Sequence, residues 1–145
     1  MKDLHSKIIL VSALAAAVLS ADEASAAIDL QGYDAAEIAI AVGVGGITFS
    51  GTNKVEFVLE HSDDDSTYTK VELDDVLGVA AMTDGIIKSL VAAHASAAVY
   101  RVGYKGGKRY LKLTADFSGT HGTGTPIAAM VIKSRGFDQP EADQV

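Results

Sequence analysis

The sequence predicts an all-β protein, an antiparallel β-sandwich or barrel with a jelly-roll-like order of about seven to eight short strands. Two alternating runs of apolar and polar residues flank Gly106 and Gly107. A third alternating run covers residues 54–61, and turns rich in Gly, Ser and Asp separate the runs at regular spacing. These patterns do not distinguish an open sandwich from a closed barrel, so both remain open here.

The segment 98–117 is predicted to form a hairpin that turns at Gly106 and Gly107. Both central residues of such a two-residue turn need positive φ, which glycine adopts without steric cost. A slip of one residue would scatter the apolar side chains over both faces. In this register the apolar pairs on one face are Val102 with Leu111, Tyr100 with Leu113, and Ala98 with Ala115.

The remaining strands follow from the same period of two. Residues 126–133 are apolar on both faces and are predicted to form a buried final strand. Residues 84–97 fit a helical face or a buried strand, and we expect a strand over residues 85–91 followed by a loop. Further strands are expected at residues 28–30, 37–42, 54–61 and 68–73, with a Gly-rich loop at residues 43–53.

Composition restricts the class of protein. The chain has 145 residues, the usual size of one domain with a single core, and 48% of them are hydrophobic. Nineteen acidic residues against twelve basic ones give a net charge of −7, which argues against a nucleic-acid partner. The absence of cysteine excludes disulfides, thiolate metal sites and cysteine nucleophiles.

The N-terminal stretch has two interpretations. Lys2 and Lys7, the apolar run 8–19 and the small residues 24–26 match a secretory signal pattern. The apolar run is too short and too rich in alanine to span a bilayer, so no membrane association is expected. We favour an extended apolar segment over residues 4–11 that packs on protein, either as an ordinary first strand or as an arm that adds to a neighbour's sheet edge. The arm's expected partner-binding residues are Leu4, Ile8, Ile9, Leu10 and Val11.

Three regions are expected along the chain. Residues 1–21 are the N-terminal arm, residues 22–135 the β-sandwich domain, and residues 136–145 a flexible, polar C-terminal tail. No internal repeat or linker divides the middle region.

No pattern in the sequence assembles a catalytic or ligand-binding site. The Gly-rich stretch 41–50 has Thr48 where a dinucleotide fingerprint needs its third glycine. The segment 121–124, HGTG, resembles a hydrolase oxyanion loop but lacks a G-x-S-x-G elbow. The three adjacent acids at residues 63–65 do not match the alternating spacing of a calcium loop. We therefore expect no enzyme activity, no cofactor and no metal.

Four stretches, taken in order, carry a family resemblance: IDLQGYDAAE (28–37), NKVEFVLEHSDDDSTY (53–68), YRVGYKGGKRY (100–110) and DFSGTHGTGTP (116–126). They resemble a family of small structural proteins encoded in the head-gene clusters of tailed phages, prophages and phage-like particles. The resemblance covers most of residues 22–133.

The resemblance implies a virion protein that decorates or cements the capsid exterior. Its expected partner is the major capsid protein, and it is expected to be a homotrimer that clamps coat subunits with the N-terminal arm. A tail or neck component of the same particle is one alternative function. A secreted β-sandwich adhesion module with a true signal peptide is the other.

Overall fold

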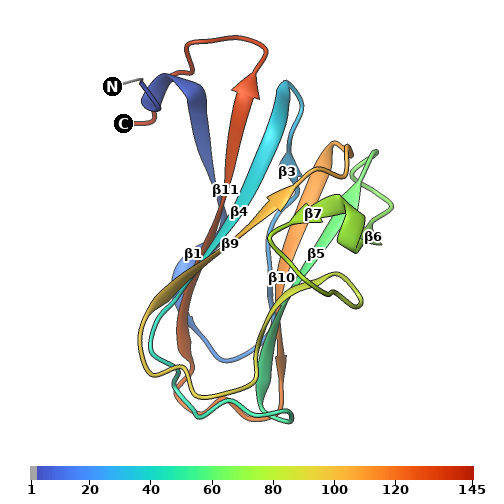
Figure 1. Ribbon diagram of the computed structural model, residues 1–145. Helices are drawn as coiled ribbons and strands as arrows, with labels where there is room; N and C mark the ends of the chain where they lie inside the picture. The colour runs from blue at the N-terminus through green and yellow to red at the C-terminus, as the bar shows by residue number, and fades with distance from the viewer. Residues whose placement is uncertain (1–2) are drawn as a thin grey trace.

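A computed structural model describes residues 3–145, which form two antiparallel sheets packed face to face (Figure 1). Sheet A has the strand order β1-β11-β4-β9-β7. Sheet B has the order β2-β10-β5-β6, with β3 also paired to β10 and β8 to β5. The predicted all-β class is confirmed. Of the two predicted architectures the sandwich is right and the closed barrel is wrong.

Residues 3–145 form eleven strands, of which seven contain five or more residues. The prediction of about seven to eight strands included residues 28–30 and 68–73, which contain the short strands β3 and β6. It missed the two-residue strands β2 and β7, which carry no periodicity to read. The long strands are β1 (Ile8–Leu19), β4 (Tyr33–Val42), β5 (Lys54–Ser62), β8 (Ile86–Leu90), β9 (Ala98–Tyr104), β10 (Tyr110–Ser118) and β11 (Thr125–Gly136). The short elements are β2 (Glu23–Ala24), β3 (Ile28–Asp29), β6 (Thr69–Lys70), β7 (Val76–Leu77) and the 3-10 helices η1 (His5–Lys7) and η2 (Leu73–Asp75).

The core lies between the sheets and follows the alternation along each long strand. In β5 the inward side chains are Val55, Phe57 and Leu59, as predicted, and all three are fully buried. Burying each of them contributes about 1.5–3 kcal/mol relative to exposure. From the other strands the core receives Ile38, Ile40, Val102, Leu111, Leu113, Ile127 and Val131, among others.

The predicted hairpin at residues 98–117 is wrong. β9 lies in sheet A, paired with β4 and β7, whereas β10 lies in sheet B, paired with β5. The segment between them crosses from one sheet to the other, and only Gly107 of the glycine pair has positive φ. Alternation identifies which side chains face the core, but it does not say to which sheet a strand belongs. Val102 and Leu111 both enter the core, from opposite sheets instead of from a cross-strand pair.

Other sequence-based elements are confirmed. The ambiguous segment 84–97 contains the strand β8 followed by a loop, as expected. A final strand is present as β11, but the prediction that it is buried on both faces is wrong, because Ile127, Ala129 and Val131 face the core whereas Pro126 and Met130 on its outer face are exposed. The Gly-rich stretch is the loop from β4 to β5.

Within that loop Gly46 makes a close backbone approach. A Cβ atom placed there would lie 1.7 Å from the carbonyl oxygen of Gly124. Gly46 N–H also donates to Thr125 Oγ1 at 3.1 Å, so the loop is fastened to the start of β11. Gly51, in the same loop, has nothing within 4 Å of its Cβ position.

We predict that Gly46→Ala lowers the free energy of unfolding by about 2 kcal/mol or more, because two backbone segments must separate to admit the methyl group. Gly51→Ala is the matched control and is expected to change it by less than about 1 kcal/mol. Urea unfolding followed by circular dichroism measures both. Equal effects of the two substitutions would contradict the proposed close approach.

Candidate functional site

β1 forms one edge of sheet A over its whole length of twelve residues. The opposite edge of sheet A and both edges of sheet B carry strands of two to five residues, namely β7, β2, β3, β6 and β8. Short edge strands limit pairing with other chains, and β1 departs from that protection.

The composition of β1 favours the addition of another strand. It contains no charged residue, and Leu10 and Val18 are 45% and 62% exposed. Its register against β11 shifts between Ser12 and Leu14 and again between Leu14 and Ala17. Such bulges increase local twist. A long, uncharged edge offers main-chain hydrogen bonds and alternate side-chain contacts to an extended partner.

The C-terminal segment after β11 folds back onto the start of this edge. The two chain ends lie together at one end of sheet A (Figure 1). Lys7 Nζ donates to Gln139 Oε1 at 2.8 Å, and Glu141 N–H donates to the carbonyl of Ser6 at 3.2 Å. The region predicted to be a flexible tail, residues 136–145, thus has defined partners near the N-terminus.

Gln144 covers the backbone of Leu10 in the way a neighbouring strand would. Leu10 N–H donates to Gln144 Oε1 at 2.9 Å, and Gln144 Nε2–H donates to the Leu10 carbonyl at 2.9 Å. Leu10 therefore directs both backbone groups away from β11, and the period of two gives Ser12 the same direction. The tail's hydrogen bonds end at Leu10, and residues 12–19 of the edge receive none from it.

We predict that Gln144→Ala accelerates amide hydrogen exchange at Leu10 by tenfold or more, because its N–H loses the side-chain acceptor. The amides of Ile9 and Val11 are internal controls, since they face β11 in the ladder. NMR-detected exchange of the full chain resolves all three. An unchanged exchange rate at Leu10 would show that the side-chain amide of Gln144 does not protect this edge.

The structure places the predicted arm residues in two settings. Leu4 precedes η1 and is 66% exposed. Ile8, Ile9, Leu10 and Val11 begin β1 and pair with β11 of the same chain. These four thus follow the first-strand alternative within the chain, while their addition to a neighbour's sheet stays a prediction. Residues 1 and 2 of the arm lie outside the described residues.

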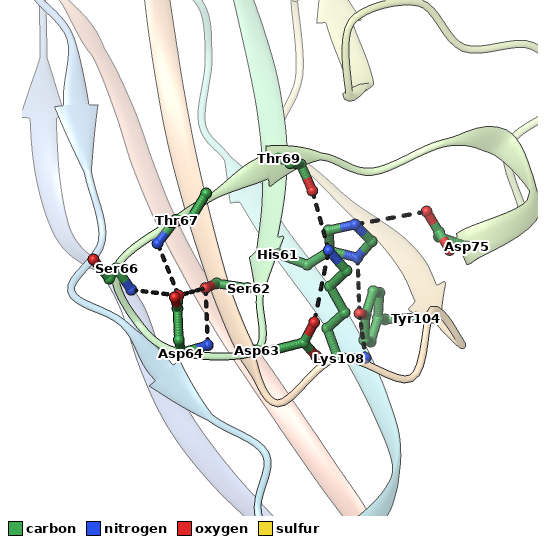
Figure 2. A network of polar contacts seen from close by, with 10 residues as sticks. All are labelled: His61, Ser62, Asp63, Asp64, Ser66, Thr67, Thr69, Asp75, Tyr104 and Lys108. Atoms are coloured by element: carbon green, nitrogen blue, oxygen red, sulfur yellow. Dashed lines mark hydrogen bonds and ion pairs between the residues drawn. The ribbon is translucent and has the colours of Figure 1, made fainter.

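A buried polar network at the other side of the sandwich is centred on His61 (Figure 2). His61 is 6% exposed, and its Nδ1 lies 2.9 Å from the Tyr104 hydroxyl. That hydroxyl accepts the backbone N–H of Lys108 at 3.1 Å, so its own proton is free for Nδ1. The imidazole proton then lies on Nε2, which is 4.0 Å from Asp75 Oδ2. The network ties β5, η2, β9 and the crossing segment together.

Burial sets the protonation states in this network. It lowers the pKa of His61 below its ordinary value and raises the pKa of Tyr104 to about 12. Both side chains are therefore neutral near pH 7, which suits a structural hydrogen bond.

The acidic turn 63–65 is organised by Asp64. Its carboxylate accepts the backbone N–H groups of Thr67 and Ser66 and the hydroxyl of Ser62, as Figure 2 shows. These bonds, the backbone ones first, lower the pKa of Asp64 to about 2. Asp63 instead faces Lys108 Nζ at 3.9 Å. The acids thus have separate partners, and residues 3–145 contain no group of three or more His, Cys, Asp or Glu side chains placed to hold a metal ion.

We predict that His61 makes stability fall as the pH falls from 7 to 5. The unfolded imidazole takes up a proton near pH 6.5, whereas the buried one resists it, so the unfolded state binds more protons in this window. The slope from one such group is at most about 1.4 kcal/mol per pH unit.

Comparing urea unfolding of the wild-type chain with His61→Gln over this pH range measures the effect. A smaller pH slope in the variant supports it, and parallel slopes would refute it. His5, whose pKa is raised by its contact with Asp143, is present in both proteins and cancels in the comparison.

The HGTG segment is a turn closed by the Gly124 N–H, which donates to the His121 carbonyl at 2.8 Å. The His121 ring is buried, donates from Nε2 to the Ser118 carbonyl, and packs edge-on to Phe117. This side chain therefore contributes to packing at the loop before β11.

Within the described chain no helix is long and apolar enough to cross a membrane.

Comparison with known proteins adds little to this geometry. No protein-family model and no curated protein matches the sequence. A solved chain of a Bacillus endospore appendage, from a family of disulfide-linked pili, aligns with 92% of this chain and 95% of its own length. The sequence identity is 14% and the TM-score 0.39, a likeness too remote to carry an argument.

Proposed function

We propose that this protein is a virion structural protein that decorates the capsid and binds the major capsid protein by adding its β1 edge to an extended coat segment. The observation that carries the proposal is the uncharged twelve-residue edge strand, beside short strands at the other sheet edges. The resemblance of four sequence stretches to phage head proteins supplies the identity of the partner.

The energetics of strand addition suit a cementing role. Each main-chain hydrogen bond contributes a net free energy of about 0.5–1.5 kcal/mol, so a partner strand along residues 12–19 gains a few kcal/mol before side-chain contacts are counted. A shell presents many identical sites, and simultaneous contact with several of them converts modest affinity into stable attachment.

We predict that Ser12→Pro weakens binding of the full chain to empty phage heads by at least tenfold, or about 1.4 kcal/mol. Proline removes the Ser12 N–H, which faces away from β11, and an edge strand tolerates that loss. Ser12→Ala keeps the N–H and is the matched control. Co-sedimentation with heads measures binding, and circular dichroism confirms that both variants fold.

A folded Ser12→Pro variant that binds heads like the wild-type chain would overturn strand addition at this edge. Parallel co-sedimentation with isolated tails distinguishes a head protein from a tail or neck component. Binding to tails alone would replace the decoration role with that second one.

A further inference from the structure

The outer faces of the two sheets differ sharply in polarity. The outward residues of β5 and β10 in sheet B include Lys54, Glu56, Glu60, Lys112 and Asp116. Those of β11, β4 and β9 in sheet A include Pro126, Ala128, Met130, Ile132, Ala39, Ala41 and Val99, together with Ser134, Glu37 and Arg101. The last two form an ion pair at 3.4 Å. One face of an antiparallel sheet is ordinarily solvated and polar, so an apolar outer face indicates an unseen partner.

The apolar face of sheet A carries both projections and a depression. A shallow hollow of about 630 Å³ runs across β1, β11, β4 and β9. Val99 and Val18 flank it and are 71% and 62% exposed. Alanines form much of its lining, namely Ala16, Ala17, Ala41, Ala97, Ala98 and Ala128. A surface that presents aliphatic projections beside an alanine-lined hollow meets the condition for pairing with itself.

The size of this face suits a weak dimer. Four strands about 4.8 Å apart lie side by side over the seven residues of β9, which at ~3.3 Å each give a patch of roughly 19 Å by 23 Å. Two such patches bury about 900 Å² in total, close to the ~1,000 Å² of a specific interface and in the range of weak ones.

Charge does not oppose a second copy on this face. The chain carries a net charge of −7, so two copies repel each other through most of their surfaces. The outer face of sheet A is the exception, because its two charges have opposite sign and are already paired. We propose that two copies of this chain associate through the outer faces of sheet A, about a twofold axis, with the projecting valines of each copy packed over the hollow of the other.

This interface uses side chains on the sheet face, whereas the proposed coat contact uses backbone groups on the β1 edge. A twofold arrangement pairs two copies and closes, because each patch is used once. It therefore differs from the trimer that the family resemblance implies.

The test measures the mass of the full-length chain in solution without phage heads. The chain mass is 15.0 kDa, so we expect twice that value at about 100 µM protein, with dissociation on dilution into the micromolar range. Val99→Lys is expected to raise the dimer Kd at least 100-fold, because two lysines enter the apolar interface. Val91→Lys, at an exposed valine in the loop after β8, is the matched control and remains dimeric.

A wild-type monomer or trimer at this concentration would overturn the proposal, as would an unaltered dimer of Val99→Lys. Because Val99 is highly exposed, its substitution leaves the core intact, and urea unfolding verifies this. Ser12→Pro should remain dimeric while losing head binding, so failure of this proposal and failure of the coat contact give different results.

Discussion

The pairing of β11 with both β1 and β4 is the constraint on which the rest of the structure depends. It joins the first long strand and the last in adjacent positions at one side of sheet A. Because the two strands are antiparallel, the start of β1 meets the end of β11, and both chain ends lie at the same end of the sandwich. The C-terminal segment is thereby delivered to the one long sheet edge, where Gln144 satisfies the backbone of Leu10.

The two sheets have different relations to solvent. Sheet B places charges outside and closes its edges with short strands, which is the arrangement of a surface that remains in water. Sheet A leaves an apolar face and a long edge. Such a surface favours uncontrolled association with other chains. Two bulges in β1 and the hydrogen bond between Leu10 and Gln144 limit that association. Two surfaces therefore remain available to partners: the β1 edge for an added strand, and the outer face of sheet A for a flat partner.

Much of the core was predictable from the sequence, because burial follows local alternation. Val55, Phe57 and Leu59 show this. In β11 the apolar residues on both faces predicted burial on both, but only the inner face is buried, because the pattern does not say whether a second layer covers the outer face. The pairing of strands was not predictable, since residues 98–117 alternate as a hairpin would although β9 and β10 lie in different sheets. The second half of β1 was missed because alanines and two register shifts hide its period. The contact between Gln144 and Leu10 could not be predicted, because the two residues are 134 positions apart in the sequence.

The symmetry of an assembly follows from which of these surfaces each partner uses. When a self-complementary face pairs two copies, the face is fully covered in both. It therefore has no surface left with which to form a ring of three. An edge strand that adds to a different chain leaves the copy's own face untouched. Taken together, the two proposals give a preformed pair that meets a coat shell with two free edges, related by the same twofold axis. Each pair then offers two strand-binding edges, and it is this doubling, more than the strength of either contact, that would hold neighbouring coat subunits together.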